Sequence, residues 1–321
     1  MKNTPLGARG PDISTIGFGA WAIGGMNWGK TDDAVSKKAL NVAIDQGVTL
    51  IDTADVYGHG HSEKLIAEVI KERGKGNICI ATKAGNDFYN ASPGDDQGMG
   101  PIIQTYTKDY IVFAAEQSLK RLKLETLDIL QLHSPNLDKL EMDEPWQALE
   151  QLKKDGKILH AGWSVQSFQE TEHAHILDTH HDILDVIQVR YNLLERKAEE
   201  MLFPKAIRYG IGVIVRIPLL FGLLTGKFNR NSRFGEDDHR RMNLSPDKLE
   251  SYLSELDRIK PLFDKYPDQT KAQVSLRFCL AHPACQTAIP GAKNPAQVID
   301  NCTSSDLGPL TQEDMDLMDI K

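Results

Sequence analysis

The sequence contains few cysteines and no long apolar run. Its four cysteines, Cys79, Cys279, Cys285 and Cys302, show no C-x-x-C spacing and are too few to build a disulfide framework in 321 residues. No stretch approaches the ~18 apolar residues of a membrane-spanning helix, and the opening MKNTPLGARGPDIS lacks the apolar core of a signal peptide. These absences predict reduced thiols and a cytoplasmic protein.

Basic residues are also in the minority. Asp and Glu number 45 against 37 Lys and Arg, which gives a formal charge of −8. Nucleic acids and anionic membranes attract basic surfaces, so we expect neither as a partner. The hydrophobic share of 40% is ordinary for a globular protein with a large core. Because single α/β barrels reach this length, we expect one domain over residues 1–321.

Short, branched, apolar runs alternate with amphipathic stretches along the chain, a pattern typical of buried parallel strands and surface helices. Strands are predicted at 15–19, 49–53, 78–83, 127–133, 160–165, 186–191, 212–217 and 287–290. Helices are predicted at 32–46, 62–73, 108–123, 143–154, 168–180, 196–209, 246–264, 270–281, 295–302 and 311–319. This alternation predicts an α/β fold of right-handed βαβ units, and the eight strands close most simply as a (β/α)8 TIM barrel.

Three further segments stand outside this alternation. The opening TPLGARGPDIS has turn signals at Gly7 and Gly10, which predict an N-terminal β-hairpin before the barrel. Two long polar segments, 84–107 and 222–244, follow predicted strands, and the second is rich in Lys and Arg. Because barrel active sites lie where strands end and loops begin, we expect these long loops to contribute to function at the C-terminal rim.

Four polar residues lie at or just after the ends of three successive strands. Asp52 and Tyr57 lie in LIDTADVYG, Lys83 in ICIATKAG and His133 in LDILQLHSP. Any one of them alone is typical of a polar residue that caps a strand at the rim. Because neighbouring parallel strands end at the same rim, we expect the four side chains to share one site.

A phenol, an ammonium, a carboxylate and an imidazole in one site can place a proton on a carbonyl oxygen. A tyrosine with a pKa of about 10 donates poorly at pH 7 unless that pKa falls. We expect Lys83 to lower the pKa of Tyr57, and Asp52 to hold Lys83 in place and protonated. His133 would hydrogen-bond the substrate oxygen and orient it.

These motifs resemble the aldo-keto reductase family over nearly the whole chain, in the contexts DTADVYG-x₄-E, ATK and QLH. The resemblance implies a barrel whose bottom is plugged by the hairpin, an NADP(H) cofactor and a small carbonyl substrate reduced by hydride transfer. The segments KAG, YNLLER and GLLTGK are similar to bacterial members. Potassium-channel β subunits share this fold, so a redox-sensing interaction protein is the alternative function.

The resemblance also implies cofactor contacts in the second half of the chain. Ser164 and Gln188 would contact the carboxamide of the nicotinamide. The pyrophosphate would contact Pro218, Leu219 and Lys227, with Arg233 as a further phosphate contact. The 2′-phosphate would contact Lys293 and Gln297, and the adenine would contact Asp300 and Asn301. Independently of the family, Asn294-Pro295 predicts a helix start, and helix starts bind phosphate.

Three positions depart from the family pattern. Val165 follows Ser164 where many members have asparagine, so one carboxamide hydrogen bond is missing or replaced. Arg216 stands where an aromatic residue usually stacks on the nicotinamide, and its guanidinium plane can stack as well. Gln297 replaces a frequent arginine near the 2′-phosphate, so phosphate affinity would depend on Lys293, Lys227 and Arg233.

The substrate pocket is expected to be mixed in polarity. Trp21 and Trp163 would form apolar walls, while Asn86, Asp87, Ser134 and Arg216 lie at or just beyond strand ends. Unpaired buried polar groups are unfavourable, so this lining favours a small polar, sugar-like or anionic aldehyde. Arg216 would bind such a substrate, contact the cofactor or pair with a nearby acid.

Other motifs predict less. The sequence from Gly17 to Ala22 matches G-x-G-x-x-A, but a Gly-rich loop follows instead of a helix, which argues against a dinucleotide-binding Rossmann domain. His59 and His61, and the histidines between 173 and 181, lack the spacing of a zinc site, so we expect no metal. Lys83 as the Schiff-base lysine of an isomerase or aldolase remains a third function, although Asp52 would oppose the lowered pKa that it requires.

Overall fold

The computed structural model describes residues 1–25, 28, 31–90 and 103–318, and within them eight parallel strands form one sheet in sequence order. The strands are β3 Phe18–Gly19, β4 Leu50–Asp52, β5 Cys79–Ala84, β6 Leu127–His133, β7 Ile158–Ser164, β8 Val186–Arg190, β9 Gly212–Arg216 and β10 Thr287–Ala288. The amide of Gly17 donates to the carbonyl of Ala288 at 2.9 Å, and the amide of Gly19 to that of Pro290 at 3.1 Å. These bonds join the first strand to the last, and the predicted (β/α)8 barrel is confirmed.

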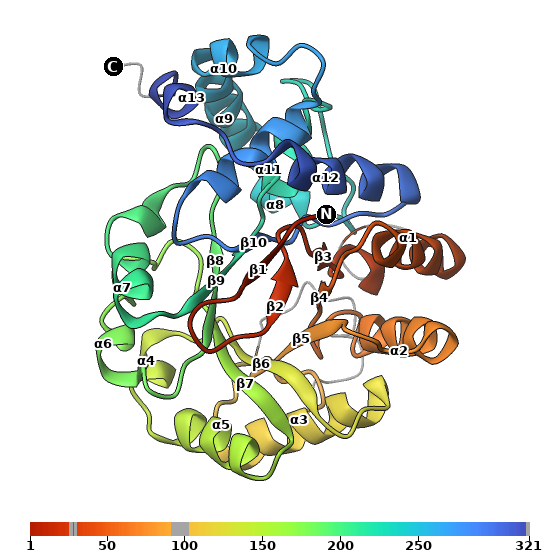
Figure 1. Ribbon diagram of the computed structural model, residues 1–321, viewed down its shortest axis with the longest axis vertical. Helices are drawn as coiled ribbons and strands as arrows, with labels where there is room; N and C mark the ends of the chain where they lie inside the picture. The colour runs from red at the N-terminus through yellow and green to blue at the C-terminus, as the bar shows by residue number, and fades with distance from the viewer. Residues whose placement is uncertain (26–27, 29–30, 91–102, 319–321) are drawn as a thin grey trace.

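Helices surround the strands on all sides in the view of Figure 1. They are α1 Asp33–Asp45, α2 His61–Arg73, α3 Lys108–Leu122, α4 Leu137–Leu140, α5 Glu144–Lys154, α6 Ile176–His180, α7 Leu202–Tyr209, α8 Arg240–Asn243, α9 Pro246–Arg258, α10 Lys260–Asp264, α11 Lys271–Ala281, α12 Pro295–Leu307 and α13 Gln312–Asp316, with 3₁₀ turns η1 Ala22–Gly24, η3 Lys197–Glu199 and η4 Leu220–Thr225. Side-chain caps start several of them: Asp32 accepts from the amides of Ala34 and Val35, and Asn294 from that of Gln297. No helix in the described ranges is long and apolar enough to cross a membrane.

The predicted N-terminal hairpin is present as β1 Asn3–Pro5 and β2 Asp12–Ser14, which pair antiparallel. Its buried residues Leu6 and Ile13 form a separate apolar cluster with residues such as Leu50 and Val186, which begin their strands. Figure 1 shows β1 and β2 crossing the middle of the barrel. The hairpin therefore closes the end from which the strands start, and the opposite rim is left for the site.

Several predicted helix boundaries are wrong. The helix expected at 168–180 is only α6, because the chain turns at Phe168, which has φ of +66°, and the carboxylate of Glu170 accepts from the Phe168 amide. The helix expected at 246–264 breaks into α9 and α10 before Pro261, which cannot donate an amide hydrogen. The segment 196–209 divides into η3 and α7, and α8 lies within the long polar segment 222–244. Much of the other long segment, 91–102, lies outside the described residues.

Candidate active site

Two charged side chains inside the barrel, Lys83 of β5 and Asp52 of β4, form a buried ion pair. Lys83 is 0% exposed and Asp52 is 3% exposed. The Lys83 Nζ donates to both Asp52 carboxylate oxygens at 2.8 Å and to the carbonyl of Thr53 at 2.7 Å. An ammonium has three N–H groups, so each has an acceptor. Burial lowers the pKa of Lys83, and the charge of Asp52 acts against that shift.

Two glutamines complete the surroundings of Asp52. Gln188 of β8 donates its Nε2–H to Asp52 Oδ1 at 2.6 Å, and Gln131 of β6 donates to the same oxygen at 3.4 Å. Both glutamines are buried. The carboxylate therefore receives donors from β5, β6 and β8 together, which fixes its orientation inside the barrel.

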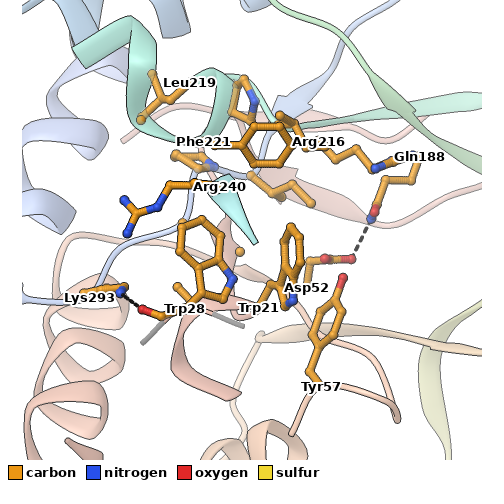
Figure 2. Close-up of a pocket in the computed structure, with 18 of the residues that line it drawn as sticks. Trp21, Trp28, Asp52, Tyr57, Gln188, Arg216, Leu219, Phe221, Arg240 and Lys293 are labelled. Atoms are coloured by element: carbon orange, nitrogen blue, oxygen red, sulfur yellow. Dashed lines mark hydrogen bonds between the residues drawn. The ribbon is translucent and has the colours of Figure 1, made fainter. Parts of the chain in front are cut away.

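Tyr57 lies in the loop after β4 and faces this pair. The Lys83 Nζ lies 5.2 Å from the centre of the Tyr57 ring, and Figure 2 shows the hydroxyl pointing toward Asp52. Burial, followed by the charge of Asp52, raises the pKa of Tyr57 above its ordinary value. The expected net lowering of this pKa is not found, because burial and the charge of Asp52 dominate at the phenol. The phenol stays protonated at pH 7, the state that a proton donor requires.

His133 ends β6 beside Tyr57. The two ring centres lie 5.8 Å apart with the planes at 81°. Burial, with the charges of Lys83 and Arg216, lowers the pKa of His133 well below its usual value, so the imidazole is neutral at pH 7. Its Nδ1 is buried and has no hydrogen-bond partner among the described residues. A neutral imidazole here can hydrogen-bond a substrate oxygen without adding charge.

One cavity of about 540 Å³ begins at this group and extends to the start of α12. The predicted site residues that line it are Trp21, Asp52, Tyr57, Asn86, Asp87, His133, Gln188, Arg216, Pro218, Leu219, Lys227, Lys293, Gln297, Asp300 and Asn301. The residues at its two ends are far apart in sequence, because Tyr57 and His133 follow β4 and end β6, whereas α12 follows β10. The cavity therefore joins the four polar groups to the predicted phosphate-binding segment.

Arg216 ends β9 and lines this cavity close to the tyrosine. Its Nη2 donates to the carbonyl of Val165 and to the hydroxyl of Ser167, both at 2.9 Å, while its Nε is buried without a partner in the described structure. The neighbouring Arg190 is neutralised by Glu195, whose carboxylate it contacts through Nε at 2.6 Å. No carboxylate among the described residues hydrogen-bonds Arg216, although the charges of Glu170 and Asp52 act on it. It presents to the cavity a positive charge that is not directly paired within the described residues.

Three cations gather at the other end of the cavity. Burial and the charges of Arg240 and Lys293 lower the pKa of Lys227, and burial with the charge of Arg240 lowers that of Lys293. One acid, Asp238, pairs with Arg240, whose Nε lies 2.8 Å from the carboxylate. Figure 2 shows Arg240 and Lys293 flanking the indole of Trp28, and the Lys293 Nζ donates to the carbonyl of Trp28 at 2.5 Å. The net charge of these four ionised groups is +2, which suits a phosphate.

The residues fit a nicotinamide dinucleotide. The three cations and the start of α12 could hold the phosphates of the dinucleotide. The unpartnered Nε of Arg216 and the amide of Gln188 could contact its nicotinamide ring near Tyr57. The sequence did not single out Trp28, Phe221 or Arg240, although all three line the cavity. Arg240 lies in the basic segment 222–244, and the short helix α8 brings it into the cavity.

Five predicted residues are not among the described residues that line the cavity. Lys83 lies behind Asp52, and Ser164 is 1% exposed beside Gln188 in the sheet. Trp163 is 0% exposed and packs near His173, because successive residues of a strand face opposite sides and Ser164 faces the barrel interior. The Arg233 side chain is exposed and donates to nearby carbonyls, and the carbonyl of Ser134 accepts from Gln104. The prediction that Trp163 forms a wall of the substrate pocket is therefore wrong, and the roles predicted for the other four remain predictions.

Histidines noted in the sequence, such as His59 and His180, pack against different aromatic side chains. His59 stacks on Phe88 with ring centres 4.8 Å apart, and His180 stacks on Trp146 at 4.1 Å. Within the described ranges, no three His, Cys, Asp or Glu side chains are placed to hold a metal ion together. All four cysteines are free and buried.

Comparison with known proteins agrees with this geometry. Residues 15–321 match the family described as Aldo/keto reductase family. The chain is 33% identical to aldo-keto reductase YhdN of Bacillus subtilis over 93% of this chain and 87% of that protein, and 32% identical to a putative voltage-gated potassium channel subunit beta of Schizosaccharomyces pombe over 94% and 88%. It is 28% identical to the NADH-specific methylglyoxal reductase of Escherichia coli over 99% and 97%.

A solved structure gives the same result. The glycerol dehydrogenase of Gluconobacter oxydans superimposes with a TM-score of 0.82 at 32% identity, over 99% of this chain and 94% of that one. The tyrosine, the ion pair behind it and the cavity leading to α12 thus occur in a sequence and a barrel similar to those of carbonyl oxidoreductases. The chain belongs to the aldo/keto reductase family, whose members are nicotinamide-dependent oxidoreductases.

Proposed function

We propose that the protein is an NADPH-dependent reductase of small polar or anionic aldehydes and ketones. The observation that carries this proposal is the single cavity that joins Tyr57 and His133 to Lys227, Arg240 and Lys293. We also propose that residues 1–321 form one domain, because one closed sheet uses strands from both ends of the chain. The low cysteine content of the sequence supports a cytoplasmic location for it.

In this proposal Tyr57 donates the proton to the carbonyl oxygen, and His133 hydrogen-bonds that oxygen. Lys83 stabilises the tyrosinate left behind, since its ammonium lies 5.2 Å from the Tyr57 ring, and Asp52 holds the ammonium in place. The nicotinamide cofactor, when bound, supplies the hydride. Lys83 as a Schiff-base nucleophile is disfavoured, because its side chain is fully buried and all three of its N–H groups are donated.

The preference for NADPH rests on the cation group. NADPH differs from NADH by one phosphate on the adenosine ribose, and Lys227, Arg240 and Lys293 outnumber the one acid among them, Asp238. A doubly charged phosphate would neutralise the excess. The Escherichia coli relative is named as NADH-specific, and tighter binding of NADPH than of NADH by this chain is the result that the proposal predicts.

The preference for an anionic or polar substrate rests on Arg216. Its guanidinium lines the cavity near Tyr57, and its charge is not balanced by a paired carboxylate. A substrate carboxylate, phosphate or row of hydroxyls would accept a hydrogen bond from its Nε, which has no partner among the described residues. A bulky apolar ketone would leave this charge buried and unpaired.

The alternative function is regulatory. The similarity to a putative potassium channel subunit beta favours it, because a protein of that kind would bind the cofactor while acting through a partner. Both functions predict cofactor binding, so turnover separates them. The purified chain is mixed with NADPH and a panel of small aldehydes, and absorbance at the nicotinamide band is followed. Steady consumption of NADPH with polar aldehydes supports the reductase, whereas tight binding without consumption supports the regulatory protein.

A further inference from the structure

The bond between Gln188 and Asp52 links the ion pair behind Tyr57 to the region where the cofactor ring is expected. Gln188 lines the cavity, and its Nε2 lies 2.6 Å from Asp52 Oδ1, as the dashed line in Figure 2 marks. Asp52 in turn accepts two hydrogen bonds from Lys83. One carboxylate therefore contacts both the lysine that serves the tyrosine and an amide on the cavity wall.

Asp52 permits only one orientation of the Gln188 amide. A carboxylate accepts hydrogen bonds and cannot donate them, so the NH₂ group of Gln188 must face Asp52. The reversed amide would bring two acceptor oxygens together at 2.6 Å, inside a barrel where Gln188 is 1% exposed and Asp52 is 3% exposed. The Oε1 atom of Gln188 is then left to act as an acceptor, and no donor to it is found in the described part of the chain.

We infer that Asp52 is a positioning residue for the cofactor, in addition to its contact with Lys83. By fixing the amide of Gln188, it leaves Oε1 as the acceptor for the NH₂ of the nicotinamide carboxamide. The side chain of Val165 has no polar group that could hydrogen-bond the carboxamide, so recognition of the carboxamide depends more strongly on Gln188 Oε1. This inference rests on the proposed function only in taking a nicotinamide dinucleotide as the ligand.

A cofactor analogue tests which carboxamide group is recognised. In the 3-acetylpyridine analogue of NADP⁺, a methyl group replaces the carboxamide NH₂ and the carbonyl is kept. Dissociation constants for NADP⁺ and for the analogue are measured by quenching of tryptophan fluorescence. We expect the parent protein to bind NADP⁺ about fivefold more tightly than the analogue, the ratio for one net hydrogen bond.

Four variants test whether Gln188 supplies the acceptor and whether Asp52 fixes its orientation. Gln188→Met should bring the ratio to about one, because the acceptor is lost. Asp52→Asn should also reduce it toward one, because asparagine can accept or donate and no longer fixes the amide. Gln131→Met removes the same kind of side chain from the same Asp52 oxygen, but Gln131 is not among the described cavity residues, so the ratio should stay at the parent value. Lys83→Met should keep the ratio as well, because Asp52 still fixes Gln188.

The ratios distinguish this inference from the proposed function. A parent ratio near one, or a parent-like ratio in Asp52→Asn, would overturn the positioning role even if the enzyme reduces aldehydes. If both dinucleotides bind with the expected ratios and no aldehyde is reduced, the proposed function fails while the role of Asp52 stands. Should Asp52→Asn fail to fold, Gln188→Met decides alone: an unchanged ratio in that variant refutes the inference.

Discussion

Lys83→Met is the substitution whose effect on stability the structure specifies most fully. Methionine fills a similar volume but leaves the Asp52 carboxylate buried without its cation, with only the amides of Gln188 and Gln131 as donors. Removing one partner of a buried ion pair costs about 3–5 kcal/mol, because the remaining charge is uncompensated. The variant should therefore be destabilised by an amount of this order.

This cost can be expressed as a change in the melting temperature. The unfolding entropy is about 2.1 cal/mol/K per residue, so for 321 residues a loss of 3–5 kcal/mol lowers the midpoint by about 4 to 8 °C. Calorimetry or circular dichroism of the parent and variant at pH 7 measures this shift. Turnover should fall at least about a hundredfold as well, because Tyr57 loses the charge that stabilises its tyrosinate.

The double variant Asp52→Asn, Lys83→Met separates charge from packing. It removes both charges, so most of the lost stability should return, while turnover should stay as low as in Lys83→Met. A Lys83→Met midpoint within about 1 °C of the parent would refute the uncompensated-charge argument. A double variant less stable than the single variant would refute it equally.

Three further predictions concern other parts of the cavity. Arg216→Ala should lower kcat/KM for a small aldehyde carrying a carboxylate by about tenfold to a hundredfold, with less than about a threefold effect on propanal; equal losses would remove Arg216 from substrate recognition. Lys293→Ala should weaken NADPH binding about tenfold but leave NADH binding unchanged, with the exposed Lys260→Ala as control; a loss shared by both dinucleotides would contradict a phosphate contact. Burial lowers the pKa of His239 to about 4, so the unfolded state takes up its proton first as the pH falls below about 6.5. Stability should therefore fall by about 3 kcal/mol between pH 6.5 and 4 through this residue, and urea titrations of His239→Phe should lack that part of the fall.

The barrel was predictable from the sequence because its strands are short apolar runs separated by regular amphipathic stretches. The prediction of β6 at 127–133 matches its observed bounds, since a polar residue or turn limits the run at each end. Helix lengths were less predictable, because local contacts such as that of the Glu170 carboxylate with the Phe168 amide delay the start of a helix without a glycine or proline signal. The extent of α12, which continues to Leu307, depends on packing against α1 and α11.

The candidate site was predictable where residues end strands, because strand ends share one rim. Asp52, Lys83 and His133 come together for this reason. The direction of the Tyr57 pKa shift was not predictable, because it depends on how deeply the phenol is buried and how close it lies to Asp52. Nor could the sequence show which cations of segment 222–244 face the cavity, since a short helix brings Arg240 inward while Arg233 stays exposed.

The most direct test of the reductase proposal follows the hydride and the proton donor together. NADPH deuterated at C4 of the nicotinamide is incubated with the protein and a small polar aldehyde, and the alcohol is analysed for deuterium by mass spectrometry. The parent should yield deuterated alcohol, and Tyr57→Phe should yield it at least about 10²-fold more slowly while binding NADPH with unchanged affinity. Deuterium-free alcohol from the parent, or near-normal turnover by Tyr57→Phe, would contradict the proposal.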